Sequence, residues 1–283
     1  MKAPDISLVI PVYNEAENLP VLVAEVQGAL QAIGRPYEVI YVDDGSTDGS
    51  PGILRDLARD DPAVRVIRQR RNAGQSAALA AGFRAVRGGI VVTLDADLQN
   101  DPADIPRLLE RMNAFDVVCG VRANRQDTWL RKLSSRIANG VRNRVTHDSV
   151  TDVGCTLRAC RAEYLQRIPM FTGMHRFLPT LLKMEGARVT EVPVHHRPRL
   201  HGQPKYNIRN RIWRALADLF AVRWMQKRWI DRRLSEEIDA WNTTPSGSSS
   251  DSSAKPSSSA VSSSSGSPPS GASRASSRGR SGT

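Results

Sequence analysis

The chain lacks the residue patterns of a disulfide-stabilised, zinc-binding or membrane-spanning protein. Its 283 residues include three cysteines, whose spacing fits neither a disulfide framework nor a zinc site. No stretch reaches the roughly 18 uninterrupted apolar residues of a membrane span. The apolar run near the N-terminus is interrupted by Pro11 and Asn14, unlike that of a signal peptide. We therefore expect a cytosolic protein with reduced thiols that does not cross a membrane.

The last part of the chain lacks the residues that build a hydrophobic core. From about Thr243 to Thr283 it consists mostly of Ser, Gly, Pro and Ala, with no aromatic residue and a single valine. Such a segment buries too little apolar surface to offset the entropy lost on ordering, which predicts a disordered tail. The roughly 240 residues that remain suffice for one large α/β domain. We place this domain at 1–207, a basic amphipathic helical segment at 208–242 and the tail at 243–283.

Basic residues outnumber acidic ones, and the formal net charge is +11. The tail contributes +3 of this charge, from four basic residues and one acidic residue, so the rest of the chain carries +8. Between Arg197 and Arg233 there are eleven Lys and Arg residues but only two Asp residues. Such a block suits a nucleic acid, an anionic membrane surface or a phosphorylated substrate, or forms a solvated basic face. Because no nucleic-acid recognition motif is visible, we do not expect a nucleic-acid partner.

Short apolar runs alternate with stretches of helical periodicity over the first part of the chain. The pattern predicts strands at 6–10, 37–42, 64–67 and 89–94, and helices at 17–30, 48–57 and 75–86. This alternation is typical of an α/β fold with a doubly wound, mostly parallel sheet flanked by helices. Ligands of such sheets bind beyond the carboxyl ends of the strands. Later segments predict strands at 117–118 and 189–194, and helices at 129–145 and 208–238.

Two carboxylates follow the fourth predicted strand. Asp95 and Asp97 are separated by Ala96 at the point where the chain leaves the strand. Both can turn toward one hard cation there, and Mg²⁺ or Mn²⁺ takes oxygen ligands and bridges readily to substrate phosphates. A cation in this position also neutralises a diphosphate leaving group. Taken alone, the same pattern suits a polar turn, which Asp favours.

The ends of the first two strands carry polar residues suited to a nucleoside. Tyr13 can stack on a base or ribose and Glu15 can accept a hydrogen bond from either, in a segment that otherwise suits a turn before a helix. Asp43 and Asp44 follow the second strand, where an acidic residue contacts the ribose in dinucleotide-binding folds. The sequence does not decide which of the two contacts the base, and we favour Asp43.

The third strand is followed by a basic, glycine-containing turn at 70–75. Arg71 and Gly74 lie at the start of the next predicted helix, where backbone N–H groups and positive charge suit a phosphate. Neither a GxGxxG nor a Walker motif is present. We therefore expect a phosphate contact of a different kind here.

In this order, the segments at 11–15, 42–48, 71–74 and 95–99 resemble the family 2 glycosyltransferases of the GT-A fold. The resemblance is strong over 7–110. It implies that the nucleoside of a nucleotide diphosphate sugar is held by Pro11, Tyr13, Glu15 and Asp43. It also implies that Mg²⁺ or Mn²⁺ is held by Asp95, Asp97 and Gln99, with Ala96 in the nucleotide-sugar site.

The second half of the chain resembles one group in that family, the polyprenyl-phosphate glycosyltransferases. This group includes dolichyl-phosphate mannose synthases and bacterial undecaprenyl-phosphate sugar transferases. The segments that carry the likeness are 120–122, 131–136, 152–155 and 199–206. The resemblance implies that Arg122 and Arg131 clamp the lipid phosphate, and that Arg199 and Lys205 close over the donor diphosphate. Guanidinium groups match phosphate geometry, and Lys adds a point charge.

Asp152 lies in one of these segments, and two roles are open for it. A carboxylate here could act as a general base. However, a lipid phosphate with a second pKa of about 6 is mostly ionised at neutral pH and needs positioning more than deprotonation. Our hypothesis is that Asp152 orients the sugar or a clamp residue, with base catalysis as its second role.

The resemblance implies an inverting transfer of a hexose, with mannose favoured, from a nucleotide diphosphate sugar to a polyprenyl phosphate. UDP-glucose, UDP-N-acetylglucosamine and a modified pentose stay open as donors. The alternatives are a family 2 transferase with a soluble or polysaccharide acceptor, and a basic nucleic-acid-binding protein.

A lipid acceptor implies a peripheral protein on the cytoplasmic face of a membrane. The predicted helix at 208–238 carries Trp213, Phe220, Trp224 and Trp229 among basic residues, which suits an interfacial position on anionic lipid. An ordinary helix packed on the sheet is the alternative, and a separate membrane-anchoring subunit is another.

Overall fold

The computed structural model describes residues 3–122, 139–148, 150–198 and 208–230, except for the side chains of 208–214. Contacts divide the chain into two units, Met1–Ser235 and Glu236–Thr283, and the described residues lie in the first. The predicted site residues Arg131, Arg199 and Lys205 lie outside the described residues, as does the predicted tail. None of the described helices is both long and apolar enough to cross a membrane.

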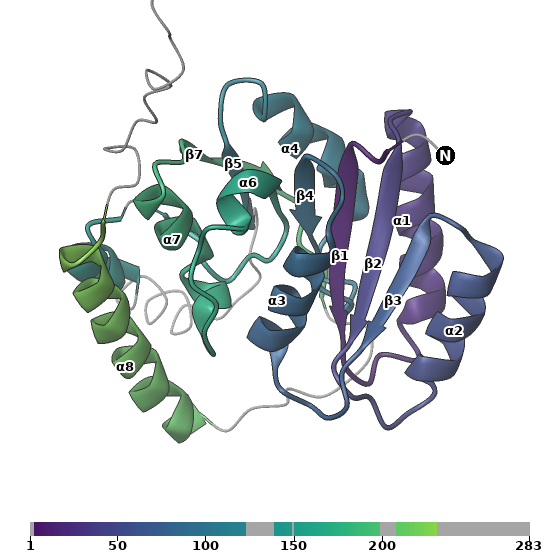
Figure 1. The fold of residues 1–283 in the computed structure, drawn as a ribbon, viewed down its shortest axis with the longest axis horizontal. Helices are drawn as coiled ribbons and strands as arrows, with labels where there is room; N and C mark the ends of the chain where they lie inside the picture. Colours follow the sequence, from purple (N-terminus) through teal and green to yellow (C-terminus); the bar gives the residue numbers. More distant parts are fainter. Residues whose placement is uncertain (1–2, 123–138, 149, 199–207, 231–283) are drawn as a thin grey trace, which may run out of the picture. The chain divides into compact units, whose positions relative to one another are not determined.

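A seven-stranded sheet forms the centre of the first unit, in the order β3-β2-β1-β4-β6-β5-β7 (Figure 1). The strands are β1 (Ile6–Val12), β2 (Tyr37–Asp43), β3 (Val64–Arg68), β4 (Ile90–Thr93), β5 (Val117–Arg122), β6 (Arg158–Arg161) and β7 (Val189–Val194). Neighbouring strands are parallel, except that β6 runs antiparallel to both β4 and β5. Because β5 therefore runs in the same direction as β4, the carboxyl ends of all strands but β6 share one edge of the sheet.

Helices cover both faces of this sheet, as the doubly wound pattern predicts (Figure 1). One hydrophobic core lies between the sheet and α1 (Leu19–Ile33), α2 (Ser50–Asp60) and α4 (Ile105–Arg111). The core on the other face is closed by α3 (Gln75–Ala85), α6 (Ala162–Leu165), α7 (Leu178–Met184) and α8 (Ile208–Lys227). Two short 3-10 helices, η1 (Pro102–Asp104) and η2 (Met174–Arg176), precede α4 and α7.

Alternating side chains of the central strands fill both cores. On β1, Leu8 and Ile10 are buried in the core that contains α1, while Val9 is buried in the core that contains α3. On β2, Tyr41 is buried in the core that contains α1, and Ile40 is buried in the core that contains α3. A strand that is buried on both faces has a nearly continuous apolar sequence, which is why these strands could be predicted.

The structure confirms the predicted fold class but contains a strand that the sequence analysis did not predict. This strand is β6, which fills the place between β4 and β5. Its sequence begins and ends with arginine, so no apolar run marks it, although Arg158 is fully buried. The local pattern therefore missed a strand that is held in place by its two neighbours.

The C-terminal helix is shorter than predicted. α8 ends at Lys227, and the described residues that follow it, 228–230, are not helical. Leu219 and Val222 are buried in the core that contains α3, whereas Phe220 and Trp224 are exposed. Apolar residues therefore lie on both sides of α8, which packs against the core that contains α3 on one side and presents aromatic rings on the other.

Candidate active site

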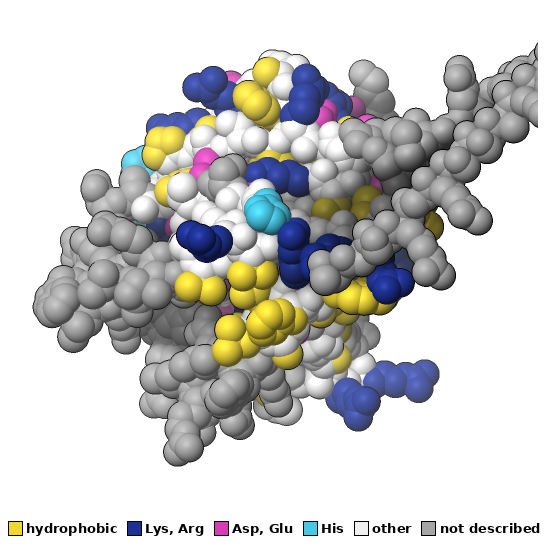
Figure 2. Space-filling model, turned by 90° about the vertical axis from the view of Figure 1, so that its left-hand side faces the viewer, with side chains coloured by type: hydrophobic (Ala, Val, Ile, Leu, Met, Phe, Trp, Pro, Cys, Tyr) yellow, Lys and Arg dark blue, Asp and Glu magenta, His cyan; other side chains and the backbone are white. Residues whose placement is uncertain are grey.

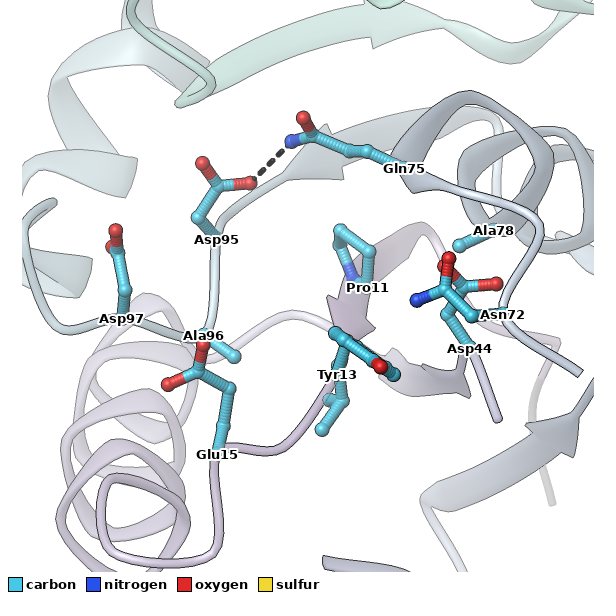
Figure 3. A pocket seen from close by; sticks show the side chains of 11 residues that line it. Pro11, Tyr13, Glu15, Asp44, Asn72, Gln75, Ala78, Asp95, Ala96 and Asp97 are labelled. Carbon is cyan, nitrogen blue, oxygen red and sulfur yellow. Dashed lines mark hydrogen bonds between the residues drawn. The ribbon is translucent and has the colours of Figure 1, made fainter. Parts of the chain in front are cut away.

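A pocket lies at the shared carboxyl edge of the sheet, formed by the loops after β1, β2 and β4 and by the start of α3 (Figure 3). Its lining residues are Pro11, Val12, Tyr13, Glu15, Asp44, Asn72, Gln75, Ala78, Asp95, Ala96 and Asp97. The pocket thus brings together most of the residues predicted at the ends of the first, second and fourth strands.

Asp95 and Asp97 follow β4, and their carboxylates point in the same direction (Figure 3). Nε2 of Gln75 donates a hydrogen bond of 2.8 Å to Oδ1 of Asp95. Asp95 is partly buried in the wall of the pocket, and the desolvation of its carboxylate, followed by the negative charge of Asp97, raises the pKa of Asp95 to about 7. Without a cation, the charge of Asp97 therefore opposes the ionisation of Asp95.

The acidic pair fits a divalent cation, which would bind both carboxylates and remove their repulsion. Among the described residues, no group of three or more His, Cys, Asp or Glu side chains could hold a metal. A cation at Asp95 and Asp97 would take its other ligands from water, an amide or a bound phosphate, as Mg²⁺ commonly does. Gln99, the third predicted ligand, lies two residues further on, and its backbone carbonyl accepts a hydrogen bond of 2.8 Å from the N–H of Arg197.

Leu98 gives the loop between β4 and η1 (94–101, hereafter the acidic loop) an unusual backbone conformation. Its φ is 59°, in the left-handed region, which costs about 1–2 kcal/mol for a residue with a side chain. The Leu98 side chain is buried in the core that contains α1. The N–H of Gln99 also donates a hydrogen bond of 3.2 Å to Oδ1 of Asp97. These contacts hold a turn that a free chain would avoid.

Hydrogen bonds to the loop after β2 fix the loop after β1. Asn14 has a φ of 51°, and its N–H donates to Oγ of Ser46 at 3.0 Å. Its Oδ1 accepts the N–H of Thr47 at 2.8 Å. Tyr13 and Glu15, on either side of Asn14, both line the pocket. The fixed loop therefore directs an aromatic ring and a carboxylate to one space, the combination that the sequence predicts for a nucleoside.

Asp44 lines the pocket and also closes the start of α3. Its two carboxylate oxygens accept the N–H groups of Ala73 and Gly74, each at 2.8 Å. The Gly74 N–H, for which the sequence predicts a phosphate contact, is thus bonded to a protein carboxylate instead. Asn72 lies beside Asp44 in the pocket (Figure 3), whereas Arg71 is exposed and is not one of the described lining residues.

Asp43, which we favoured as the base contact, is buried. Its Oδ1 accepts the N–H of Ser46 at 2.9 Å, and its Oδ2 lies 3.2 Å from Nε of Arg68. Among the described residues that line the pocket, Asp44 is present and Asp43 is not. This geometry favours Asp44 for a contact in the pocket and gives Asp43 a part in holding the turn after β2.

Arg122 and Asp152 form a bidentate ion pair at the end of β5. Nε and Nη2 of Arg122 each lie 2.7 Å from a carboxylate oxygen of Asp152, and the Arg122 N–H donates to the same carboxylate at 3.1 Å. Asp152 is buried, and a Cβ on Gly154 would clash with the guanidinium. Asp152 therefore holds Arg122 in one orientation, at the same edge of the sheet as the acidic pair.

Two further residues fix the loop of Asp152, and the sequence analysis did not single them out. Glu191 on β7 accepts hydrogen bonds from the N–H and the Oγ1 of Thr151, both at 2.8 Å. The buried Arg158 on β6 donates from Nη2 to the carbonyl of Val153 at 2.9 Å. No sequence motif marks either residue, and both become recognisable only through the pairing of their strands. Gln75 was missed for another reason. It is the last residue of the basic turn at 70–75, but nothing in the local sequence shows that its side chain contacts Asp95.

Known structures share this fold. Glucosyl-3-phosphoglycerate synthase from Mycobacterium tuberculosis, solved with Mn²⁺, UDP and glucosyl-3-phosphoglycerate, has a TM-score of 0.58 and 18% identity, covering 81% of this chain and 82% of that one. The same protein with Mn²⁺, UDP and phosphoglyceric acid has a TM-score of 0.59 and 19% identity, covering 81% and 80%. At this identity the likeness concerns the fold alone, and it confirms the predicted GT-A architecture.

The family follows from the sequence match. The protein-family model described as glycosyl transferase family 2 matches residues 7–168, which is more than half of the chain. The chain belongs to glycosyl transferase family 2, which confirms the prediction made from the motifs at the strand ends.

Similar proteins have names that specify the acceptor, undecaprenyl phosphate. The undecaprenyl-phosphate 4-deoxy-4-formamido-L-arabinose transferase of Edwardsiella ictaluri is 42% identical over 205 residues, which are 72% of this chain and 63% of that protein. The protein of the same name from Serratia proteamaculans is 45% identical over 206 residues, with the same two shares. The chain thus spans less than two thirds of the length of these relatives.

Proposed function

We propose that this protein transfers a sugar from a nucleotide diphosphate sugar to a polyprenyl phosphate, with inversion at the anomeric carbon. The observation that carries the proposal is the position of two pairs, Asp95 with Asp97 and Arg122 with Asp152, at one edge of the sheet. An acidic pair suits the cation-bound diphosphate of a donor, and an oriented guanidinium suits a phosphate acceptor. The names of the relatives, which specify undecaprenyl phosphate, support the same class of acceptor.

On this proposal the pocket binds the donor. Tyr13 and Glu15 contact the nucleoside, with Asp44 beside them. Asp95 and Asp97 hold Mg²⁺ or Mn²⁺, which when bound supplies charge neutralisation to the leaving diphosphate. The raised pKa of Asp95 supports this assignment, because a bound cation would offset both the desolvation and the charge of Asp97 that raise it.

The chemistry requires orientation more than proton transfer. An oxygen of the acceptor phosphate forms a bond to C1 of the sugar from the face opposite the diphosphate, while the bond from C1 to the diphosphate breaks and its electron pair leaves with the diphosphate. The acceptor phosphate has a second pKa of about 6 and is mostly ionised at neutral pH, so no base is needed. Asp152 is therefore proposed as a positioning residue that holds Arg122 against the acceptor.

The identity of the sugar is proposed from the relatives. They are named for 4-deoxy-4-formamido-L-arabinose, which puts a modified pentose first among the donors. Mannose, favoured by the sequence resemblance, comes second.

A transfer assay with labelled donors tests the proposal. The full chain is incubated with undecaprenyl phosphate, Mg²⁺ or Mn²⁺, and in turn UDP-linked 4-deoxy-4-formamido-L-arabinose, GDP-mannose, UDP-glucose and UDP-N-acetylglucosamine. We expect organic-extractable label from one donor, lost on chelation and in Asp97→Asn. Label on a soluble or polysaccharide acceptor alone would favour the other family 2 activity. No label from any donor with folded protein would overturn the proposal.

We further propose that α8 contacts a membrane surface. Phe220 and Trp224, one helical turn apart, are 66% and 60% exposed, and the guanidinium of Arg228 lies 5.7 Å from the centre of the Trp224 ring. Figure 2 shows hydrophobic side chains next to Lys and Arg side chains on the side of the molecule where α8 lies in Figure 1. Exposed aromatic rings beside basic residues suit the interface of an anionic bilayer.

Vesicle flotation tests this contact. The double variant Phe220→Ser with Trp224→Ser is expected to lose most of its binding to phosphatidylglycerol vesicles, while Val21→Ser, which removes a 47% exposed apolar residue from α1, keeps it. Equal flotation of both variants would exclude α8 as the contact, and no flotation of the wild type would favour a separate membrane-anchoring subunit.

A further inference from the structure

The segment 195–198, hereafter the strap, follows β7 and lies against the acidic loop that follows β4. His196 forms an isolated antiparallel bridge with Asn100. The N–H of Arg197 donates to the carbonyl of Gln99 at 2.8 Å. The strap therefore contacts the backbone of the acidic loop immediately beyond Asp97.

The strap and the loop are also joined through the next turn of the chain. The N–H of His195 donates to Oδ2 of Asp104 at 2.6 Å, and its Nδ1 lies 3.0 Å from Oδ1 of the same carboxylate. Asp104 is buried at the end of η1. The acidic loop is thus tied to the strap on both sides of Asp101.

The side chain of Arg197 binds two carboxylates from different elements. Its Nη1 donates to both oxygens of Glu25 on α1, at 2.7 and 2.9 Å, and its Nη2 lies 2.7 Å from Oδ2 of Asp101 in the acidic loop. Partial burial opposes the charge of Arg197, but the two carboxylates outweigh it and raise its pKa. A permanently charged group therefore links α1, the acidic loop and the strap.

This link acts on a strained turn. Leu98, with a φ of 59°, is held from the inside by its buried side chain. Its neighbour Gln99 is held from the outside by the backbone N–H of Arg197, and the guanidinium fixes the position of that backbone through Glu25 and Asp101. A left-handed residue with a side chain persists only where its surroundings over-determine the conformation, so loss of either support should loosen the turn.

We propose that Arg197 is a positioning residue that latches the acidic loop, so that Asp97 and Gln99 are presented to the cation in a fixed geometry. This role for Arg197 rests on the metal-dependent transfer proposed above, because the geometry of the strained turn matters for activity only if Asp97 and Gln99 bind a cation. A merely structural ion pair would stabilise the fold without a local effect on this loop.

The other end of the same strand offers a matched control. Arg188, just before β7, binds Asp116 through Nε at 3.0 Å and Nη2 at 3.2 Å. This is also a bidentate arginine–carboxylate pair, but it lies at the opposite edge of the sheet. Arg188→Ala therefore removes a similar interaction without touching the acidic loop.

The experiment compares Arg197→Ala, Arg197→Lys and Arg188→Ala in the full chain. Hydrogen exchange of peptides that cover 95–104 is measured in the metal-free protein, and binding of Mn²⁺ alone is measured by electron paramagnetic resonance. We expect Arg197→Ala to exchange faster over 95–104 and to bind Mn²⁺ about tenfold more weakly, the typical effect of a residue that orients metal ligands. Arg197→Lys should lie between it and the wild type, and Arg188→Ala should change neither quantity.

The two measurements keep the latch separate from the proposed metal dependence. Exchange over 95–104 and Mn²⁺ affinity that are the same in Arg197→Ala and Arg188→Ala would overturn the latch. If the wild type binds no Mn²⁺, the metal dependence fails, and the exchange of the metal-free protein still decides whether Arg197 holds the loop. If Arg197→Ala does not fold, Glu25→Gln, which neutralises one carboxylate partner, is measured in the same way.

Discussion

Gln75 and Asp95 come from different elements but are in direct contact: Nε2 of Gln75, the first residue of α3, lies 2.8 Å from Oδ1 of Asp95 after β4. Asp44 fixes the same helix terminus from the other side, through the N–H groups of Ala73 and Gly74. The acidic side and the nucleoside side of the pocket therefore share one support, the start of α3.

Loss of the Gln75 amide should weaken cation binding. In Gln75→Ala, Asp95 loses one of the donors that orient its carboxylate, so we expect the dissociation constant for Mn²⁺ to rise by up to about tenfold. Gln69→Ala is the control, because Gln69 lies before the same turn but is not one of the described residues that line the pocket. Titration of Mn²⁺ into the metal-free variants measures the effect. An unchanged constant in Gln75→Ala would show that the hydrogen bond does not orient the ligand.

Cation binding should depend on pH through Asp95. The pKa of this carboxyl is about 7 in the metal-free protein, chiefly because it is desolvated. Below that pH a proton competes with the cation for the carboxylate, so the Mn²⁺ affinity should fall by up to about tenfold per pH unit and level off above it. Titrations between pH 5 and pH 9 test this. An affinity that stays constant from pH 5 to pH 7 would contradict the raised pKa.

The same carboxyl should make the stability of the metal-free protein depend on pH. Because the pKa of Asp95 is higher in the folded than in the unfolded state, its contribution to the free energy of unfolding falls as the pH rises from about 4 to about 7. Asp95→Asn should therefore be more stable than the wild type at pH 8, by about 1–2 kcal/mol when its partial solvent exposure is taken into account. At pH 4 this gain should be absent. Urea unfolding with a chelator measures both values, and a gain of equal size at the two pH values would contradict the linkage.

The Arg122–Asp152 pair predicts a defect specific to the acceptor. Asp152→Asn should lower kcat/KM for polyprenyl phosphate by up to about 100-fold, because Arg122 loses its fixed orientation, while the KM for the donor changes little. The double variant Arg122→Ala with Asp152→Ala should be about as impaired as Arg122→Ala alone, because the two residues act as a unit. Asp116→Asn, which removes the partner of Arg188, is the control. Near-normal turnover in Asp152→Asn would refute both roles considered for Asp152.

The sequence predicted most of the residues that line the pocket, but not the contacts that hold those residues in place. The strand ends were recognisable because β1 and β2 are apolar on both faces and then turn polar abruptly. The choice between Asp43 and Asp44 could not be made from the sequence, because successive side chains at a strand end point in opposite directions and the sequence does not give the direction; in the structure Asp44 lines the pocket. β6 was missed because it begins and ends with arginine, so no apolar run marks it as a buried strand.

The positioning contacts could not be predicted because their partners are distant in the sequence. Arg197 and Glu25 are separated by 172 residues. Glu191 reaches Thr151 only because β7 pairs with β5. Such contacts depend on the order of the strands, which local periodicity does not specify.

Two glycines should respond to the same substitution with opposite signs. Gly45 has a φ of 71°, and a Cβ there would lie 2.5 Å from the carbonyl carbon of Arg71, so Gly45→Ala should destabilise the protein by about 2–4 kcal/mol. It should also weaken nucleotide binding, because the clash separates the loop of Asp44 from the turn that starts α3. Gly28 lies within α1, and apart from its chain neighbours and the adjacent backbone of the helix no described atom lies within 4 Å of its Cβ position, so Gly28→Ala should stabilise by about 0.5–1 kcal/mol. Urea unfolding of the two variants measures the difference, and changes of the same sign would contradict the close approach of the two loops.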